Sequence, residues 1–518
     1  LYKFILMLIY ERDKIKKSEF FEIDASLSNS GINFFLNNKP TSKNTNNNNI
    51  NNNHKNHNNA NSKNNNKNNK KFSIKYPKEI WNSVSDKNKQ ILLDNLTFAL
   101  SCHLPAANNE KGKKGIIYKT ALPCFESFIF KSTIYDIPST ALIDNKKTSN
   151  YMKRFFNSQF YFKNYDTKLP ITKPNKQKEN KKRINKQKTA IILFSAGKES
   201  LLTLAMCKEL NIRPILVYID ECDSENYHEY ETIHKNKIIK KLKKEQNIEV
   251  YTIKNKLNEF QFNGYFDDME FNNWGFGAML TIFLLEVIPF AHKFNADYIF
   301  FGNEFSCDHN TINEDGWKTN YIYDQSSEWV KNLNIISRLM TDGKTQVGSL
   351  VSPLFELGLI KILHEKYPDL AKLQMSCFAD TEHGEHNRWC CNCSKCARLY
   401  VFFKALNIKP DRVNLDKCLF AKKYRKLFSV FGSHDDMVGF DQSGLGAQEQ
   451  QLAFMMAIEN KVNGALIEEF KLKPKYQSLI RKKNSMKKKF FGVYDSIAIP
   501  GELKIQVNKI YKKHLNKF

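Results

Sequence analysis

A short run of small and polar residues lies between a stretch of strand length and a stretch of helical spacing. Its members are Ser195, Ala196, Gly197, Lys198, Glu199 and Ser200. The unbonded N–H groups and the positive end of a helix that begins after such a loop both favour an anion. Gly197 lets the backbone approach without a Cβ clash, Lys198 can add a cation, and the two serines can add hydroxyl donors. The run predicts a phosphate cradle, and the alternative is an ordinary turn between a strand and a helix.

Strands alternate with helices around this loop. Residues 190–194 form an unbroken apolar run, which is typical of a strand covered on both faces. Further strands are predicted at 213–220, 248–253 and 296–302, and helices at 201–210, 227–244, 275–294 and 397–406. Such alternation predicts an α/β fold, with a parallel sheet and helices on both faces.

Three acids follow predicted strands. Ligands of a parallel sheet lie beyond the carboxyl ends of its strands, so Asp220, Glu304 and Asp308 should share one rim with the loop. Asp220 either caps its strand or contacts the ribose or adenine of a nucleotide. Glu304 and Asp308 are either solvated loop acids or hold Mg²⁺ against the phosphates of ATP, since hard cations prefer carboxylate oxygens. We predict that residues 195–200 and Asp220 bind ATP, and that Lys198, Glu304 and Asp308 are catalytic.

Residues 302–330 form a long polar stretch with little periodicity. Loops of this length in a compact domain are usually functional or disordered. Trp317, Tyr321, Tyr323 and Trp329 argue against disorder. We predict a lid that faces the substrate. Further along, Gln448, Glu449 and Gln450 could reach a ligand at a helix start, although an ordinary surface helix is the simpler reading.

Five cysteines crowd into residues 377–396. Cys390, Cys393 and Cys396 have the spacing C-x₂-C-x₂-C, and with Cys377 they supply the four thiolates of a tetrahedral Zn²⁺ site. With all four places filled by protein, such a site is structural. The alternatives left open are Cys391 in place of Cys390, His383 or His386 in place of Cys377, and an iron–sulfur cluster.

Composition limits the partners and the compartment. The chain has 518 residues, a net charge of +26 and 11 cysteines. The charge could favour nucleic acid or an anionic membrane, but Lys and Asn are abundant throughout, so we favour a small-molecule partner over nucleic acid. Residues 4–10 are too short an apolar run to span a bilayer. With no secretion signal, clustered cysteines favour metal over disulfides and hence a reducing, cytoplasmic location. The oligomeric state stays open.

The chain divides by composition into six parts. Residues 44–71 are a low-complexity Asn- and Lys-rich tract with little to bury, which predicts disorder. In the part that follows, helices are predicted near 80–81 and 91–100 and strands at 116–118, 128–130 and 134–135. The parts are an N-terminal segment (1–71), an α+β domain (72–167), a basic linker (168–188), an ATP-binding domain (189–376), a zinc knuckle (377–406) and a helical C-terminal region (407–518).

The loop at 195–200 resembles the S-G-G-x-D-S loop of the PP-loop ATP pyrophosphatases, which cleave ATP to AMP and pyrophosphate. Ala196 stands where that family usually has Gly, and Glu199 where it usually has Asp. With the cysteine knuckle, residues 189–406 resemble the 7-cyano-7-deazaguanine synthase family. A longer resemblance, to the muramoyl-peptide glutamate epimerase family, is carried by residues 302–308, 316–328, 389–396 and 444–454.

These resemblances imply an adenine nucleotide alpha hydrolase-like fold and a reaction in which ATP, with Mg²⁺, adenylates a carboxylate and releases pyrophosphate. The best match is a glutamate epimerase acting on a UDP-muramoyl-peptide-like substrate, in which adenylation makes the neighbouring α-proton more acidic. Alternatives are a 7-cyano-7-deazaguanine synthase-like ligase, a tRNA-modifying PP-loop enzyme, and a non-catalytic nucleotide- or metal-binding scaffold.

Overall fold

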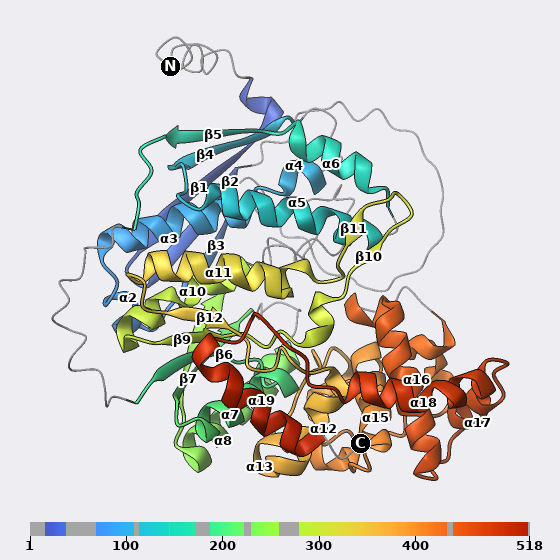
Figure 1. Cartoon of the computed structure of the whole chain (residues 1–518). Coiled ribbons are helices and arrows are strands. Elements are labelled where there is room, and N and C mark those ends of the chain that lie inside the picture. Colours follow the sequence, from blue (N-terminus) through green and yellow to red (C-terminus); the bar gives the residue numbers. More distant parts are fainter. Residues whose placement is uncertain are drawn as a thin grey trace.

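The computed structural model describes residues 16–37, 69–107, 113–143, 146–170, 187–221, 229–257, 279–432 and 439–515 (Figure 1). Ten strands form one sheet in the order β12-β9-β6-β7-β8-β3-β2-β1-β4-β5, and β10 (Thr311–Ile312) pairs separately with β11 (Lys318–Thr319). The strands of the large sheet are β1 (Phe20–Ser28), β2 (Gly31–Asn37), β3 (Asn69–Lys75), β4 (Gly115–Ala121), β5 (Gln159–Asn164), β6 (Thr189–Leu193), β7 (Arg213–Asp220), β8 (Glu249–Asn255), β9 (Tyr298–Phe300) and β12 (Gln346–Gly348).

Helices lie on both faces of this sheet, and further helices form the C-terminal region beside it. They are α2 (Lys78–Trp81), α3 (Asp86–Ala99), α4 (Leu104–Ala107), α5 (Glu126–Ile143), α6 (Thr148–Phe156), α7 (Lys198–Glu209), α8 (Glu229–Gln246), α10 (Met279–Phe294), α11 (Ser327–Met340), α12 (Glu356–Lys366), α13 (Pro368–Ala371), α14 (Glu382–His386), α15 (Ser394–Ala405), α16 (Gly444–Glu459), α17 (Ala465–Lys471), α18 (Tyr476–Phe490) and α19 (Gly501–Leu515). The predicted α/β architecture, with a large, mostly parallel sheet between helices, is confirmed.

Consecutive side chains of the buried strands enter two different cores. On β6, Ile192 packs into a core shared with α7, α8, α12 and α15, while Ile191 packs into a core shared with α3, α10 and α11. An unbroken apolar strand is the expected result, because a strand with helices on both sides has no solvent face. β6 therefore holds the two layers of helices together.

The strand order reverses at β6. From β6 the chain goes to β7 and β8 on one side and then returns to place β9 and β12 on the other, with every neighbouring pair in this half parallel. Loops after β6 and β9 therefore diverge at the same edge. In open parallel sheets this point is where ligands bind.

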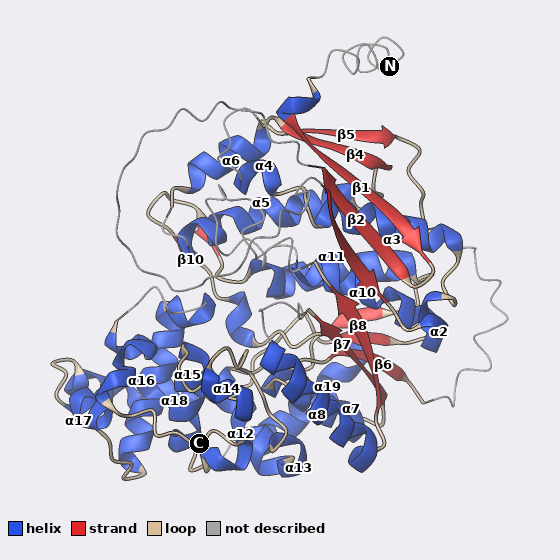
Figure 2. Cartoon of the chain, turned by 180° about the vertical axis from the view of Figure 1, so that it is seen from behind, coloured by secondary structure: helices blue, strands red, loops and turns tan. Residues whose placement is uncertain are grey.

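The N-terminal half of the sheet joins this half through β3. Strands β1, β2 and β3 are antiparallel, β3 pairs antiparallel with β8, and β4 and β5 continue the sheet beyond β1 in parallel (Figure 2). The predicted disordered tract lies mostly outside the described residues, but its last three residues, 69–71, begin β3.

The prediction of strands at 128–130 and 134–135 is wrong, because both runs belong to α5. Short apolar runs do not by themselves distinguish a buried strand from a buried helix. In α5, Ile129 and Ile137 are fully buried, and the helix packs beside α3, α6 and the 3₁₀ turn η5 (Tyr323–Gln325). The helices predicted at 91–100 and 397–406 are confirmed as α3 and α15, within a few residues at each end.

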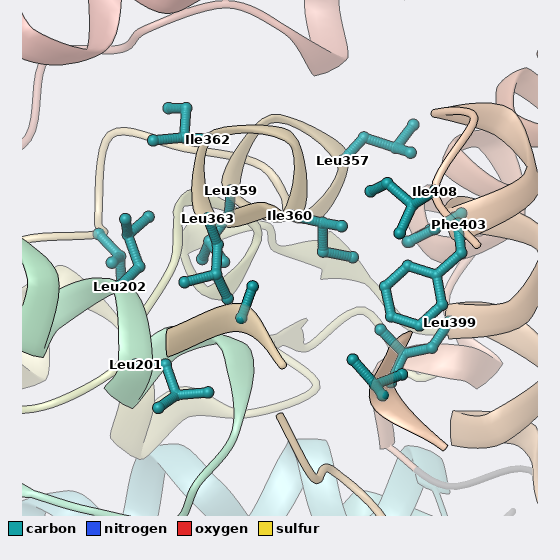
Figure 3. Packing of buried hydrophobic residues seen from close by; sticks show 14 of the residues in the cluster. Leu201, Leu202, Leu357, Leu359, Ile360, Ile362, Leu363, Leu399, Phe403 and Ile408 are labelled. Atoms are coloured by element: carbon teal, nitrogen blue, oxygen red, sulfur yellow. The ribbon is translucent and has the colours of Figure 1, made fainter. Parts of the chain in front are cut away.

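Helix α12 links the sheet to the C-terminal helices. Figure 3 shows its apolar side chains between Leu201 and Leu202 of α7 on one side and Leu399 and Phe403 of α15 on the other. All of these side chains are fully or almost fully buried. The helices that follow gather beside the half of the sheet that contains β6 (Figure 1). Among the described residues, no helix combines the length and the apolar character needed to cross a membrane.

A buried acid on α10 allows a test of this packing. Glu286 is fully buried, accepts a hydrogen bond from Asn255 Nδ2 at 2.8 Å, and has no partner for Oε2 among the described residues. Burial, and then repulsion from Glu221, raises the pKa of Glu286 well above its usual range. The folded protein therefore keeps this proton, whereas the unfolded chain releases it above its ordinary pKa.

We predict that Glu286→Gln raises the melting temperature at pH 8. At this pH the unfolded wild-type chain must take up a proton at Glu286 in order to fold, and the neutral glutamine needs none. The stability that the protonated carboxyl gives wild type is complete below the unfolded pKa and is lost as pH rises. The advantage of the variant should therefore shrink toward pH 4. Thermal unfolding of both proteins across this range measures it, and an advantage that is constant with pH would contradict the assignment.

Candidate functional site

The loop after β6 turns sharply from the end of the strand into the start of α7. Phe194 N–H extends the sheet by donating to Val217 O at 2.9 Å, and Gly197 then caps α7. Ala196 between them has φ 58°, a left-handed conformation that glycine adopts more readily. Its carbonyl accepts a hydrogen bond from Met375 N–H at 2.9 Å, which fixes the turn. Because first-turn amides of a helix have no intrahelical acceptor, those of residues 198–200 are available to a ligand.

Oxygen atoms crowd around Gly197. A Cβ on this residue would lie 3.0 Å from Glu199 Oε2, 3.2 Å from Ser195 Oγ and 3.7 Å from Ser376 Oγ. The Ser376 hydroxyl is buried and has no hydrogen-bond partner among the described residues. Ser200 Oγ donates to Gly197 O at 3.1 Å, so this serine fixes the loop. A Cβ at this position would therefore crowd the side chains of Glu199 and Ser195, and the unpaired Ser376 hydroxyl lies beside it.

A pocket of about 260 Å³ opens at the carboxyl ends of β6, β7 and β9. Its walls are apolar and aromatic near the strands, with Phe194, Tyr218 and Phe301, and polar near the loop, with Ser195 and Asn303. Asn303 is 4 % exposed and its Nδ2 has no partner among the described residues. An apolar wall with a polar end is typical of a small-molecule pocket, and the acids Glu199 and Glu221 also line this one.

Lys198 lies beneath the loop, in contact with acids. Its side chain is 6 % exposed, its Nζ lies 3.1 Å from Glu356 Oε1, and it also pairs with Glu199. Burial alone would lower the pKa of Lys198, but Glu199, Glu356 and Glu304 together raise it above its usual value. The ammonium is therefore charged. The structure places it against carboxylates rather than open to solvent.

The ion pair continues away from the loop. Arg398 on α15 lies 3.1 Å from Glu356 Oε2 and also pairs with Asp441. Both acids are 1 % exposed. A chain of alternating charges thus runs from α7 through α12 to the segment before α16. We refer to Lys198, Glu356, Arg398 and Asp441 as the buried ion chain.

Glu304 interacts electrostatically with Lys198 and Glu356 of this chain. It is partly buried; Ser306 Oγ donates to Oε1 at 2.8 Å, and Oε2 has no partner among the described residues. Burial raises the pKa of Glu304 to about 7, opposed by Lys198 and reinforced by Glu356. Glu449 of α16 is fully buried, and its Oε1 accepts a hydrogen bond from Leu357 N–H at 2.8 Å.

Asp220 and Asp308 face elsewhere. Asp220 Oδ1 accepts from Thr232 Oγ1 at 2.9 Å, at the start of α8. Asp308 Oδ1 accepts a hydrogen bond at 2.7 Å from the N–H of Ser327, the first residue of α11. Asp308 also lines a second pocket of about 210 Å³, with Tyr135, Lys318 and Glu328. This pocket lies within the predicted lid, so Asp308 is near substrate-sized space but is not joined to Glu304 in a cation site.

Residues remote in sequence complete the loop's surroundings. Sequence reasoning missed Glu356, Arg398, Asp441 and Ser376, because none belongs to a local motif. Glu449 was weighed as a possible ligand contact and set aside as surface, whereas it is buried. The available signal for a buried Glu449 was a run of polar residues, 448–450, near the start of an otherwise apolar helix.

The four predicted cysteine ligands do converge. The sulfurs of Cys377, Cys390, Cys393 and Cys396 all lie within 4.8 Å of one another, and the Cys390 and Cys396 sulfurs are 3.8 Å apart. Tetrahedral zinc with Zn–S bonds of about 2.3 Å separates its sulfurs by about 3.8 Å. The group can therefore hold a metal such as zinc. His383 and Cys391 belong to a different group, so neither replaces Cys377 or Cys390, and His386 belongs to neither group among the described residues.

Neighbouring groups support thiolates at this site. Cys377 Sγ accepts backbone N–H bonds from Ala379 at 3.3 Å and Cys390 at 3.2 Å, and Cys393 Sγ accepts one from Cys396 at 3.4 Å. The Lys395 ammonium, which interacts electrostatically with Cys393, packs over the ring of Phe378. Such donors and a nearby cation offset the excess negative charge of four thiolates around a divalent ion.

No protein-family model matches the chain, and no curated protein matches it. Function has to be inferred from the geometry of the loop, its pocket and the four-cysteine group.

We predict that Cys396→Ser lowers bound zinc by one equivalent and lowers the melting temperature, since binding free energy at a structural site is folding free energy. Cys418→Ser is the matched control, because this cysteine is exposed and lies outside the group. Elemental analysis and thermal unfolding measure both effects. Equal zinc content in the two variants would contradict the site.

Arg398→Met tests the buried ion chain. The substitution leaves two buried carboxylates without their guanidinium, and removing one partner of a buried pair costs about 3–5 kcal/mol. Arg425→Met is the control, because the pair of Arg425 with Glu469 is exposed and such pairs contribute about 0–1 kcal/mol. Urea unfolding gives both free energies, and similar losses in the two variants would refute a special role for the chain.

Proposed function

We propose that this chain is an ATP-dependent, AMP-forming enzyme of the PP-loop type, which adenylates a carboxylate of a small substrate and releases pyrophosphate. The observation that carries the proposal is the loop at 195–200, which lies where the strand order of the sheet reverses. There the loop combines first-turn amides without intrahelical acceptors, a glycine with side-chain oxygens on several sides, and an adjacent pocket.

The parts of ATP fit the parts of the pocket. Its phosphates would lie against the loop amides, with the unpaired groups of Ser376 and Asn303 as additional donors. Its base would lie against the apolar ends of β6, β7 and β9. An ammonium has three donors, so Lys198 can contact a phosphate oxygen while it keeps Glu356 and Glu199 as partners.

Mg²⁺ would enter with the nucleotide. Proteins usually bind this ion through one or two carboxylates together with phosphates and water. Glu199 lines the pocket, and Glu304 lies within electrostatic range of Lys198, so these two acids are better placed for this role than Asp308. We assign Asp308 to the second pocket, which is lined by Ser326, whereas the neighbouring residue Gln325 lines the proposed nucleotide pocket.

The proposed reaction balances without a further reactant. A substrate carboxylate oxygen bonds to the α-phosphorus of ATP, the bond to the β-phosphate oxygen breaks, and pyrophosphate leaves with the electron pair. The acyl adenylate then has a more acidic α-proton, as an epimerase of the glutamate type would need.

Gly197→Val tests the loop directly. A branched side chain at this position would occupy the space between Glu199, Ser195 and Ser376, so we expect loss of ATP binding and of pyrophosphate release. Gly501→Val is the matched control, because Gly501 also begins a helix but has no atom within 4 Å of an added Cβ.

The measurements are the rise in melting temperature with Mg–ATP and pyrophosphate release across a panel of carboxylates that includes UDP-muramoyl-peptides. Wild type and Gly501→Val should be stabilised by ATP in proportion to RT ln(1 + [ATP]/Kd). ATP stabilisation that survives in Gly197→Val would overturn the placement of the phosphates. ATP binding without pyrophosphate release on any carboxylate would favour a non-catalytic nucleotide-binding protein.

A further inference from the structure

A second group of ligand-type side chains lies beside the four-cysteine group. His383, Cys391 and Asp416 place one nitrogen, one sulfur and one oxygen within 4.8 Å of one another. The His383 Nε2 to Asp416 Oδ1 distance is 3.2 Å. The group shares no residue with the four-cysteine group, although Cys391 directly follows Cys390. The three residues of this group are spread over 34 positions of the sequence, so their spacing would not be recognised as a motif.

The segments that carry these three side chains are fixed to one another by hydrogen bonds. Thr381, which caps α14, donates from Oγ1 to the Cys390 carbonyl at 3.2 Å. Trp389 Nε1 and Arg388 Nε both donate to the carbonyl of Val413, at 2.6 Å and 2.8 Å, and so hold the 410–416 segment against the knuckle. The convergence of the three ligands therefore follows from the packing of the backbone.

Helix α14, which carries His383, is also held from its other side. Its Gly384 carbonyl accepts a hydrogen bond from the ring of His234 on α8 at 2.7 Å, if that Nε2 carries the proton. A Cβ at Gly384 would lie 1.9 Å from Ala379 O, so this position tolerates only glycine. The imidazole of His383 thus lies on a short helix that α8 contacts on one side and residue 379 on the other.

We propose that His383, Cys391 and Asp416 bind a second transition-metal ion, Zn²⁺ in the first instance. Imidazole, thiolate and carboxylate are all ligands of zinc, and a thiolate with a carboxylate neutralises its charge. Cys391 gives its proton to solvent on binding. Cys391 is buried, whereas the side chains of His383 and Asp416 are 23 % and 53 % exposed, so water can take the fourth place. The site is open, in contrast to the closed four-cysteine group.

The alternative is a hydrogen bond between His383 and Asp416 beside a buried thiol with no metal. The two readings differ in metal stoichiometry. With the second ion, the purified full-length chain holds two zinc ions at saturation, and His383→Ala and Asp416→Asn each hold one. His386→Ala is the matched control, because His386 lies on the same helix outside the group.

The experiment removes metal from the full chain with a mild chelator, titrates zinc back, and counts bound metal by elemental analysis. Cobalt titration supplies a second readout, since His383→Ala should lose the contribution of the second ion and keep the spectrum of a four-thiolate site. Retention of that spectrum, with unchanged far-ultraviolet circular dichroism, also shows that the variant is folded.

One bound zinc in wild type would overturn the proposal. Two bound zinc ions in His383→Ala and Asp416→Asn would also overturn it, since the second ion would then lie elsewhere on the chain. Equal loss in His386→Ala would show that α14, and not the ligand set, controls the second ion.

Discussion

The ion pair between Lys198 and Glu356 connects the two regions on which the proposed function depends. Lys198 is the first residue of α7, and Glu356 is the first residue of α12. The pair therefore joins the starts of two helices, one behind the loop and one leading toward the C-terminal helices. Arg398 and Asp441 extend the same chain of charges. Burying these charges is costly unless each is paired, so the surrounding helices must hold their positions closely.

The sequence predicted the part of the site whose chemistry is local. A buried strand, a small polar loop and a helix are consecutive, and three of the four cysteines are close together in sequence. Both could be recognised from spacing. The partners of Lys198 could not, because Glu356 and Arg398 are more than 150 residues away and are brought near only by the packing of α12 and α15 on α7.

The fold shows the same division. Strands at 213–220 and near 190–194 were predictable because a strand buried on both faces is continuously apolar. The strands wrongly predicted at 128–130 and 134–135 were equally apolar, and only tertiary packing makes them part of α5. The antiparallel junction of β3 with β8 could not be inferred from the sequence. Only two residue pairs form it, Ile74 with Asn255 and Lys75 with Lys254, and so short a pairing leaves no periodic signal. It nevertheless makes one sheet of the two halves.

The hydrogen bond from Met375 N–H to the Ala196 carbonyl connects the loop to the cysteines. Ser376, whose hydroxyl lies beside Gly197, comes next in the chain, and Cys377 follows directly. Three consecutive residues thus contact the loop backbone, lie beside Gly197 and belong to the four-cysteine group. If the loop binds a nucleotide and the cysteines bind a metal, as proposed, each ligand changes the affinity for the other by the same factor. Under that proposal, the supply of metal would affect how tightly the loop holds its ligand.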